Sequence, residues 1–314
     1  MIKKLVIGTR ASKLALWQAN YVAGRIKDHY PEVEVVLKNI VTTGDKVLDV
    51  PLAKIGGKGL FTKELEKELL SGEIDLAVHS LKDMPTELPA GLALGVISER
   101  TDIGDALVSI KYTSINSLPC GARIGTSSLR RKAQLLNYRP DLVVQDLRGN
   151  IDTRLAKLAN TEFDAIVLAV AGLKRLKWEQ YITQVLPEDI CLPAVGQGAL
   201  AIEIRTDDQA VLSVIDFLHH RPTALAVAAE RAFLSELEGG CQVPIGVHSH
   251  LDDGVLHISA VILSVDGRQR LAASISGQPR DSVVMGRKLA RQMYDNGGRE
   301  ILASLREGEG KGHE

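Results

Sequence analysis

The stretch EGGCQVPIG, residues 238–246, places a thiol at an unusual point of the backbone. Cys241 follows two glycines and comes shortly before Pro244. Glycine reaches conformations closed to other residues, and proline stops a helix from continuing. The segment could therefore be a loop that presents a sulfur atom for chemistry. Taken alone, the string favours the alternative of a helix cap followed by a buried cysteine, because free cysteines are among the most buried residues.

Basic side chains gather between residues 123 and 157. This stretch holds eight basic and three acidic residues, a net charge of +5 in a chain whose net charge is −1. GTSSLRR predicts a helix start with two arginines in its first turn, and RGNIDTR repeats the arrangement. The polar residues of these two helix starts are Thr126, Ser127, Ser128, Arg130, Arg131, Arg148 and Arg154. Amides, hydroxyls and guanidinium groups at a helix start bind anions, so we favour anion binding over a solvated charged face.

The expected ligand is a polyanion, and arginine suits carboxylates as well as phosphates. Glycine-rich KIGGKG (54–59) adds Lys54 and Lys58 on a loop expected to be mobile, although its spacing is not that of a P-loop. Nucleic-acid binding needs aromatic platforms or a basic stripe. Aromatic residues make up 4% of the chain and none interleave with the arginines of 123–137. Nucleic acid is therefore not an expected partner.

A candidate acid lies in VHSLKDMP, residues 78–85. This string ends a predicted strand, and Asp83 would project from the carboxyl edge of the sheet, where α/β folds place ligands. Lys82 beside it could hold Asp83 ionised or bind an anion. The alternative is a turn-forming aspartate, which the string alone favours. His79 lies within the strand and is expected to be structural.

Hydrophobic periodicity predicts the elements that position these residues. The strands are predicted at 4–8, 33–41, 74–81 and 92–97, with a helix capped by Ser12 and running to about His29, and another at 61–72. Strand–turn–helix units follow at 122–138, 141–160 and 163–176. This alternation indicates largely parallel sheets covered by helices on both faces. The last third predicts a helix at 222–240, a hairpin at 255–277 and a helix at about 281–306, which together indicate a small α+β domain.

Composition limits the class of protein. A chain of 314 residues with 25% charged residues is typical of a globular protein of two or three domains. The net charge is close to zero and no apolar run is long enough to span a bilayer, so a membrane protein is not expected. Three widely spaced cysteines, at positions 120, 191 and 241, suggest neither a disulfide framework nor a metal site. A cytoplasmic location is the natural expectation.

Two rival functions remain open at this point. A two-lobed carboxylate-binding protein without chemistry would explain the arginines but not the glycine-flanked Cys241. A cysteine hydrolase or acyltransferase would need a histidine paired with Cys241. His248 and His250 are near in sequence, but strand alternation would place both on one face, and nothing in the sequence brings that face to the sulfur.

Eight motifs in order resemble those of the porphobilinogen deaminases, also called hydroxymethylbilane synthases. They are KLVIGTRASKLALWQA, KIGGKGLFTKELE, AVHSLKDMP, GTSSLRR, LRGNIDTRL, DAIVLAVAGLKRL, LPAVGQGA and EGGCQVPIG, within residues 2–306. The resemblance implies an α/β fold of two type II periplasmic-binding-protein-like domains around a cleft, with a small C-terminal α+β domain. The implied domains are 1–98 with 199–216, then 99–198, then 217–314.

The resemblance also implies a transferase of tetrapyrrole and haem biosynthesis. Four porphobilinogen molecules would be condensed head to tail onto a dipyrromethane cofactor, with loss of ammonia and final hydrolysis to hydroxymethylbilane. Cys241 would carry the cofactor through a thioether, and Asp83 would be catalytic. The implied cofactor-binding residues are Ser80, Lys82, Thr126, Ser127, Ser128, Arg130, Arg131 and Arg154; the substrate-binding residues are Arg10, Ser12, Arg148 and Arg175; Lys54 and Lys58 would lie on the mobile loop. No metal is implied. We expect a monomer that binds no nucleic acid or membrane and hands its product to uroporphyrinogen-III synthase.

Overall fold

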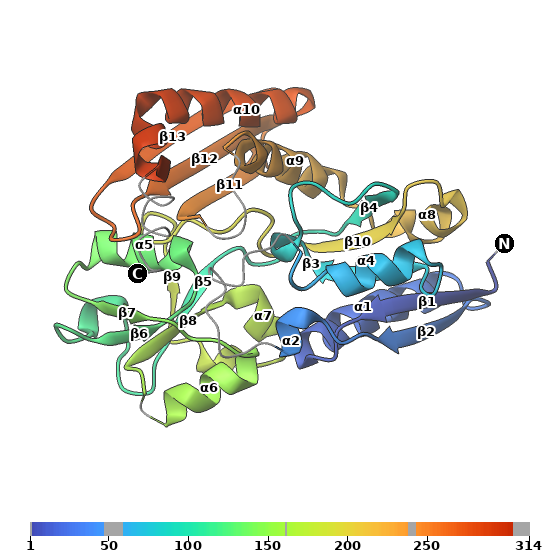
Figure 1. Cartoon of the computed structure of the whole chain (residues 1–314), viewed down its shortest axis with the longest axis horizontal. Helices are drawn as coiled ribbons and strands as arrows, with labels where there is room; N and C mark the ends of the chain where they lie inside the picture. The colour runs from blue at the N-terminus through green and yellow to red at the C-terminus, as the bar shows by residue number, and fades with distance from the viewer. Residues whose placement is uncertain (1, 47–58, 161, 238–242, 304–314) are drawn as a thin grey trace, which may run out of the picture.

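The computed structural model describes residues 2–46, 59–160, 162–237 and 243–303 of the chain (Figure 1). Cys241, Lys54 and Lys58 lie outside these residues. The described chain forms two α/β units and one α+β unit. Figure 1 shows the α+β unit, orange to red, above the other two.

The first unit is a five-stranded sheet in the order β2-β1-β3-β10-β4. Its strands are β1 (Lys4–Thr9), β2 (Glu34–Asn39), β3 (Leu76–Ser80), β4 (Leu92–Ile97) and β10 (Leu200–Arg205). Its helices are α1 (Lys13–His29), α2 (Thr43–Lys46), α4 (Lys63–Leu70) and α8 (Gln209–Ile215). The predicted strands at 4–8, 33–41, 74–81 and 92–97 are confirmed to within a few residues.

Side-chain alternation explains why helices cover both faces of this sheet. Leu5 and Ile7 of β1 point into a core shared with α1 and α8, whereas Val6 packs against the core formed with α4. Successive residues of a strand face opposite sides, so an uninterrupted apolar strand needs a covering layer on each. Ser12 caps α1 as predicted, since its hydroxyl accepts from the Ala15 amide at 3.3 Å.

The second unit has the strand order β7-β6-β8-β5-β9. Its strands are β5 (Asp105–Val108), β6 (Arg123–Gly125), β7 (Val143–Gln145), β8 (Ala165–Ala169) and β9 (Gln184–Leu186). Its helices are α5 (Leu129–Tyr138), α6 (Ile151–Ala159) and α7 (Val170–Arg175). α5 packs on one face of this sheet, and α6 and α7 pack on the other.

The prediction of largely parallel sheets needs a correction at one strand of each sheet. β10 is antiparallel to both β3 and β4, and β5 is antiparallel to both β8 and β9. Each of these strands directly follows a segment in which the chain passes between the units: residues 98–104 before β5 and 187–199 before β10. Each segment enters its sheet at the edge where the parallel strands have their carboxyl ends. The strand that follows therefore runs antiparallel to its neighbours.

This double crossing makes the first unit discontinuous in sequence, because β10 lies between β3 and β4. The predicted division into two α/β units and a small C-terminal α+β unit is confirmed. We propose the boundaries 1–98 with 199–216, 99–198 and 217–314 for the three domains.

The third unit is a three-stranded antiparallel sheet covered by two helices. Its elements are α9 (Arg221–Glu236), β11 (Ile245–Asp252), β12 (Val255–Leu263), β13 (Arg270–Gly277) and α10 (Ser282–Met293). The predicted hairpin is confirmed, and β11 adds a third strand to it. The predicted final helix is interrupted after α10, because Gly297 adopts φ 108°. The hairpin turn docks on α5, where the Asn137 side chain donates to the Gly267 carbonyl at 2.8 Å.

Candidate active site

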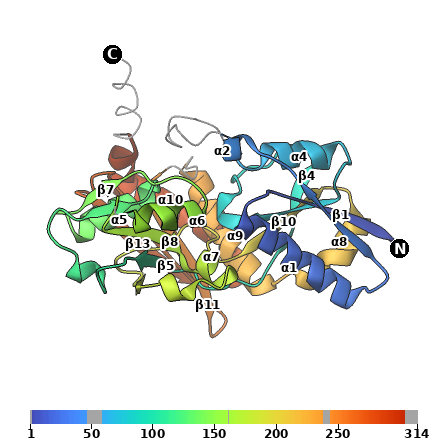
Figure 2. The ribbon, with the colours of Figure 1, turned by 90° about the horizontal axis from the view of Figure 1, so that it is seen from below.

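A cleft of about 480 Å³ lies between the two α/β units. Figure 2 shows these units side by side, with α1 and α7 at their junction. The loops that follow β1, β3, β7 and β8 line the cleft, as does the end of the second crossing segment. The predicted site residues that line it are Arg10, Ser12, Ser80, Lys82, Asp83, Arg131, Arg148, Arg154 and Arg175. The structure thus brings together residues from 10 to 175 at the carboxyl ends of the parallel strands.

The cleft is cationic. Seven basic and three acidic side chains line it: Arg10, Lys13, Lys82, Arg131, Arg148, Arg154 and Arg175 against Asp45, Asp83 and Asp152. Burial lowers the pKa of Arg175 to about 10. Burial, followed by repulsion from Arg131, lowers the pKa of Arg154 to about 10 as well. Both guanidinium groups are therefore poorly solvated, and an anionic ligand in the cleft would favour their charged form.

Asp83 and Lys82 lie where the sequence predicts, in a short 3-10 helix (Leu81–Asp83) at the carboxyl end of β3. Asp83 is exposed to the cleft and Lys82 is half-buried. Burial, with repulsion from Arg131, lowers the pKa of Lys82 to about 8, although Asp83 opposes the shift. His79 is buried and pairs with Glu203 at 3.0 Å, which confirms its structural role.

The first wall of the cleft carries Arg10 and Ser12, just after β1. Arg10 pairs with Asp45 through its Nε at 3.2 Å, and its guanidinium lies 4.2 Å from the centre of the Phe61 ring. Asp45 and Phe61 also line the cleft and were not predicted. Their sequence signal is weak, because an isolated aspartate in a loop is more often a turn residue.

The second wall carries the basic residues of the two predicted helix starts. Ser128 and Asn150 are the residues before α5 and α6, as expected. The Arg154 Nε donates to the Gly149 carbonyl at 2.8 Å, and an Arg175 nitrogen donates to the Gly198 carbonyl at 2.7 Å. These bonds hold both guanidinium groups beside the cleft.

Four predicted residues do not line the cleft: Thr126, Ser127, Ser128 and Arg130. Two of the three hydroxyls bond within the helix start, and the third bonds the loop that follows β7. Ser128 caps α5, Thr126 accepts from the Ser128 amide at 3.3 Å, and Ser127 bonds the Leu147 backbone at 3.0 Å. Their observed contacts shape the loop that presents Arg131.

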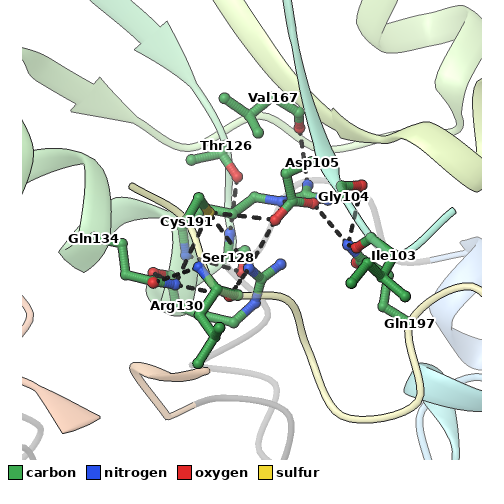
Figure 3. A network of polar contacts seen from close by, with 12 residues as sticks. Ile103, Gly104, Asp105, Thr126, Ser128, Arg130, Gln134, Val167, Cys191 and Gln197 are labelled. Carbon is green, nitrogen blue, oxygen red and sulfur yellow. Dashed lines mark hydrogen bonds and ion pairs between the residues drawn. The ribbon is translucent and has the colours of Figure 1, made fainter. Parts of the chain in front are cut away.

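Arg130 and Arg131 share one carboxylate, that of Asp105, which the sequence reasoning missed. Figure 3 shows Asp105 and Arg130. Asp105 is fully buried, and its two oxygens lie 2.7 Å from Arg130 and 2.6 Å from Arg131. Burial alone would raise the pKa of this carboxyl, but the two guanidinium groups hold it well below its usual range. Arg130 also donates to the Leu192 carbonyl at 2.7 Å. In the sequence, Asp105 is noticeable only as an acidic residue directly before a short apolar run, Ala106 to Val108.

Arg130→Leu is expected to lower the free energy of unfolding by about 3–5 kcal/mol, because it strips a buried carboxylate of one of its two cations. Urea unfolding measures this change. Arg123→Leu is the control, since Arg123 is an exposed arginine of the same basic stretch and should change stability by less than about 0.5 kcal/mol. An Arg130→Leu protein that matches the control would contradict the structural role given to this ion pair.

In the described parts of the chain, no cluster of three histidine, cysteine, aspartate or glutamate side chains has the geometry to hold a metal ion. Nor does any helix in these parts have the length and apolarity needed to cross a membrane.

Comparisons with known proteins agree with this architecture. Residues 5–213 match the family model "Porphobilinogen deaminase, dipyromethane cofactor binding domain", and residues 224–295 match "Porphobilinogen deaminase, C-terminal domain". The chain is 54% identical over 304 residues to a porphobilinogen deaminase of Geobacter sulfurreducens, covering 97% of this chain and 95% of that one. It is 50% identical over 305 residues to one of Syntrophomonas wolfei, covering 97% of this chain and 100% of that one.

Solved structures give more distant matches. A putative methionine-binding lipoprotein of Bacillus subtilis aligns with a TM-score of 0.44 and 13% identity, covering 70% of this chain and 92% of that one. A periplasmic substrate-binding protein of an ABC transporter from Coxiella burnetii aligns with a TM-score of 0.44 and 14% identity, covering 72% and 96%.

The fold and the cleft define a class: a two-lobed α/β protein with a cationic cleft between its lobes, extended by a small α+β unit. The family matches span nearly the whole chain. The chain belongs to the porphobilinogen deaminase family, and is accordingly an enzyme of the transferase class that acts in tetrapyrrole biosynthesis.

Proposed function

We propose that this enzyme joins four porphobilinogen molecules head to tail onto a dipyrromethane attached to Cys241 through a thioether. Each addition releases ammonia, and hydrolysis finally releases hydroxymethylbilane. The observation that carries the proposal is the cationic cleft with Asp83 at its wall, in a chain whose family model is a dipyrromethane-binding domain.

The residues present fit a dipyrromethane. Each of its two rings carries an acetate and a propionate, so the group is a tetra-anion, and the cleft holds under-solvated arginines that need such charge. Lys82, Arg131 and Arg154 lie near enough to interact across the cleft, because repulsion from Arg131 helps to lower the pKa of both Lys82 and Arg154. When bound, the dipyrromethane would supply the nucleophilic pyrrole carbon to which the first substrate is joined.

Asp83 is the proposed acid/base. Loss of ammonia from porphobilinogen leaves a cationic pyrrole, and a carboxylate beside the pyrrole N–H stabilises that charge as it develops. The same carboxylate can accept and return the proton that the condensation moves. Its exposed position in the cleft gives it access to substrate.

The other cleft residues bind carboxylates. Arg10, Ser12, Arg148 and Arg175 are proposed for the incoming substrate; Ser80, Lys82, Arg131 and Arg154 are proposed for the cofactor. Thr126, Ser127, Ser128 and Arg130 stay proposals for cofactor binding, and their observed contacts favour an indirect part in it. Lys54 and Lys58 are proposed to lie on a mobile loop near the cleft.

The two rival functions make different predictions. A binding protein without chemistry would carry no covalent pyrroles. A cysteine hydrolase would need a histidine at Cys241, yet His248 and His250 stack on each other at 5.5 Å on one face of β11, and His248 pairs with Glu188 at 2.9 Å. These contacts favour a structural role for His248. We also propose a cytoplasmic monomer that passes its product to uroporphyrinogen-III synthase.

The test is the intact mass of the purified enzyme, before and after limiting porphobilinogen. The untreated protein should exceed the mass of its sequence by two linked pyrroles. Limiting substrate should then give a ladder of covalent species one ring apart. A protein with the bare mass that leaves porphobilinogen unchanged would overturn the proposed function.

Arg148→Gln should make this ladder stall, so that species of particular lengths accumulate. Each added ring brings two carboxylates, so a fixed set of arginines cannot serve every stage equally. Lys157→Gln is the control, because it removes one charge from α6, which begins just after Arg148, at a residue that does not line the cleft. If Arg148→Gln slows all steps by one common factor, its role is not specific to a stage.

A further inference from the structure

The motif LPAVGQGA contains a polar side chain to which the proposed function gives no role. Gln197 is 1% exposed and lies on the second crossing segment, 187–199. Its side chain reaches the cleft wall and also the first crossing segment (Figure 3). It is therefore placed where the two α/β units and both crossings meet.

Every polar atom of this side chain is used. Gln197 Nε2 donates to the carbonyl of Ile103 at 2.6 Å and to Asp105 Oδ1 at 3.0 Å, with the Gly104 carbonyl at 3.3 Å. Its Oε1 accepts from Lys82 Nζ at 3.3 Å. Three acceptors on one side and an ammonium on the other fix which way the amide faces.

The two ends of the amide touch two different parts of the cationic site. On one side, Asp105 holds Arg131 through Nε at 3.0 Å and Nη2 at 2.6 Å, and Arg131 lines the cleft. On the other side, Lys82 also lines the cleft but belongs to the first α/β unit. Arg131 repels Lys82 and helps to lower its pKa. Asp83 and Asp105 attract the ammonium, and the Gln197 oxygen adds a neutral acceptor that fixes its direction beside the guanidinium.

We propose that Gln197 is a positioning residue, which holds the Lys82 ammonium at a fixed place relative to the Asp105-bound Arg131, so that the two cations can bind neighbouring carboxylates of one ligand. The ligand assignment rests on the proposed function above. The amide acts through Lys82 and Arg131, and the ligand's carboxylates are bound by those two side chains.

The contrasting role is purely structural, as a bond between the crossing segments. Gln134→Met provides the matched control for it. Gln134 is also buried, and its side-chain amide also bonds backbone groups. It donates to the Leu192 carbonyl at 3.0 Å and accepts from the Leu192 amide at 2.7 Å, but no bond to Lys82 is observed. Both Gln→Met changes keep side-chain length and remove the hydrogen bonds, so both should lower stability in urea.

The pKa of Lys82 distinguishes the two roles without turnover. Its acetylation rate relative to exposed lysines, followed by mass spectrometry across pH in protein without the cofactor, reports the fraction in the neutral form. Loss of a hydrogen bond to the ammonium disfavours the charged form, so Gln197→Met should lower the pKa of Lys82 from about 8 by about half a unit to one unit. Gln134→Met should leave it unchanged.

Cofactor loading gives the second readout. Loading of cofactor-free Gln197→Met protein by added porphobilinogen, followed by intact mass, should be about tenfold slower than in the wild type, the equivalent of one charged hydrogen bond. The pH above which loading fails should be lower in this variant, because the Lys82 ammonium is lost as pH rises through its pKa. In a Lys82→Met background, Gln197→Met should cause no further loss of loading, since the two residues act as one unit.

Additive effects on cofactor loading in the double variant, or an unchanged Lys82 pKa in Gln197→Met, would overturn the proposal. Gln197→Asn, which keeps the amide but withdraws it by one methylene, gives the same readouts should the Met variant fail to fold. If the proposed function is wrong, the wild-type protein will lack pyrroles and leave porphobilinogen unchanged. The Lys82 titration does not depend on turnover, so it still decides whether Gln197 positions Lys82.

Discussion

Cys241→Ser protein is expected to have the bare mass of its sequence and no measurable turnover of porphobilinogen. A serine hydroxyl is a far weaker nucleophile than a thiolate, so it should not form the link to the dipyrromethane. Without the covalent primer, the enzyme has no chain end to extend. Intact mass and a colour assay of tetrapyrrole formation measure the two effects separately.

Two other thiols serve as controls for this variant. Cys120→Ser alters an exposed thiol, and Cys191→Ser alters a buried one that donates to Asp105 at 3.3 Å. Burial raises the pKa of Cys191 to about 12, so it is a poor nucleophile. Both variants should keep the pyrrole mass. Full activity in Cys241→Ser would remove Cys241 from the mechanism.

Asp83→Ala is expected to fold normally and to lose about 100- to 1000-fold in turnover, the usual cost of removing one group that stabilises developing charge. Folding is preserved because the side chain is exposed in the cleft. Initial rates with porphobilinogen measure the loss, and thermal unfolding verifies the fold.

The matched control for Asp83 is Asp102→Ala. Asp102 is an exposed carboxylate that pairs with Lys174 at 3.0 Å and does not line the cleft. Its loss should change turnover less than twofold or so, since exposed ion pairs contribute only about 0–1 kcal/mol. Retention of more than about a tenth of the wild-type rate in Asp83→Ala would contradict a central role for this carboxylate.

Local patterns in the sequence were sufficient for many of the elements and for most of the cleft, whereas β5, β9, β10, β11 and α8 were not predicted. Ser12 caps its helix as predicted, and Ser128 caps α5 at the helix start predicted for Thr126, Ser127 and Ser128, because capping depends on residues within one turn. Asp83 and Arg131 reach one cleft because the carboxyl ends of neighbouring parallel strands lie at a common edge.

Features that depend on distant parts of the chain could not be predicted in the same way. Asp105 meets Arg130 and Arg131 across 25 and 26 residues, and Gln197 meets Lys82 across 115. No periodic pattern links such positions. The direction of β5 and β10 follows from where the chain re-enters each unit, which hydrophobicity does not encode. Cys241 itself lies outside the described residues, so its placement stays a prediction.

The position of β10 has a consequence for synthesis on the ribosome. β3 and β4 flank β10 in the finished sheet, yet β4 ends at Ile97 and β10 ends at Arg205. At about 5–20 residues per second, roughly 5–20 s pass between the synthesis of β4 and the synthesis of β10, the strand that joins β3 to β4. The second sheet needs only residues 105–186 and can close during that wait. The middle of the chain is therefore expected to fold before its beginning, while two unpaired strand edges remain open to chaperones or to wrong partners.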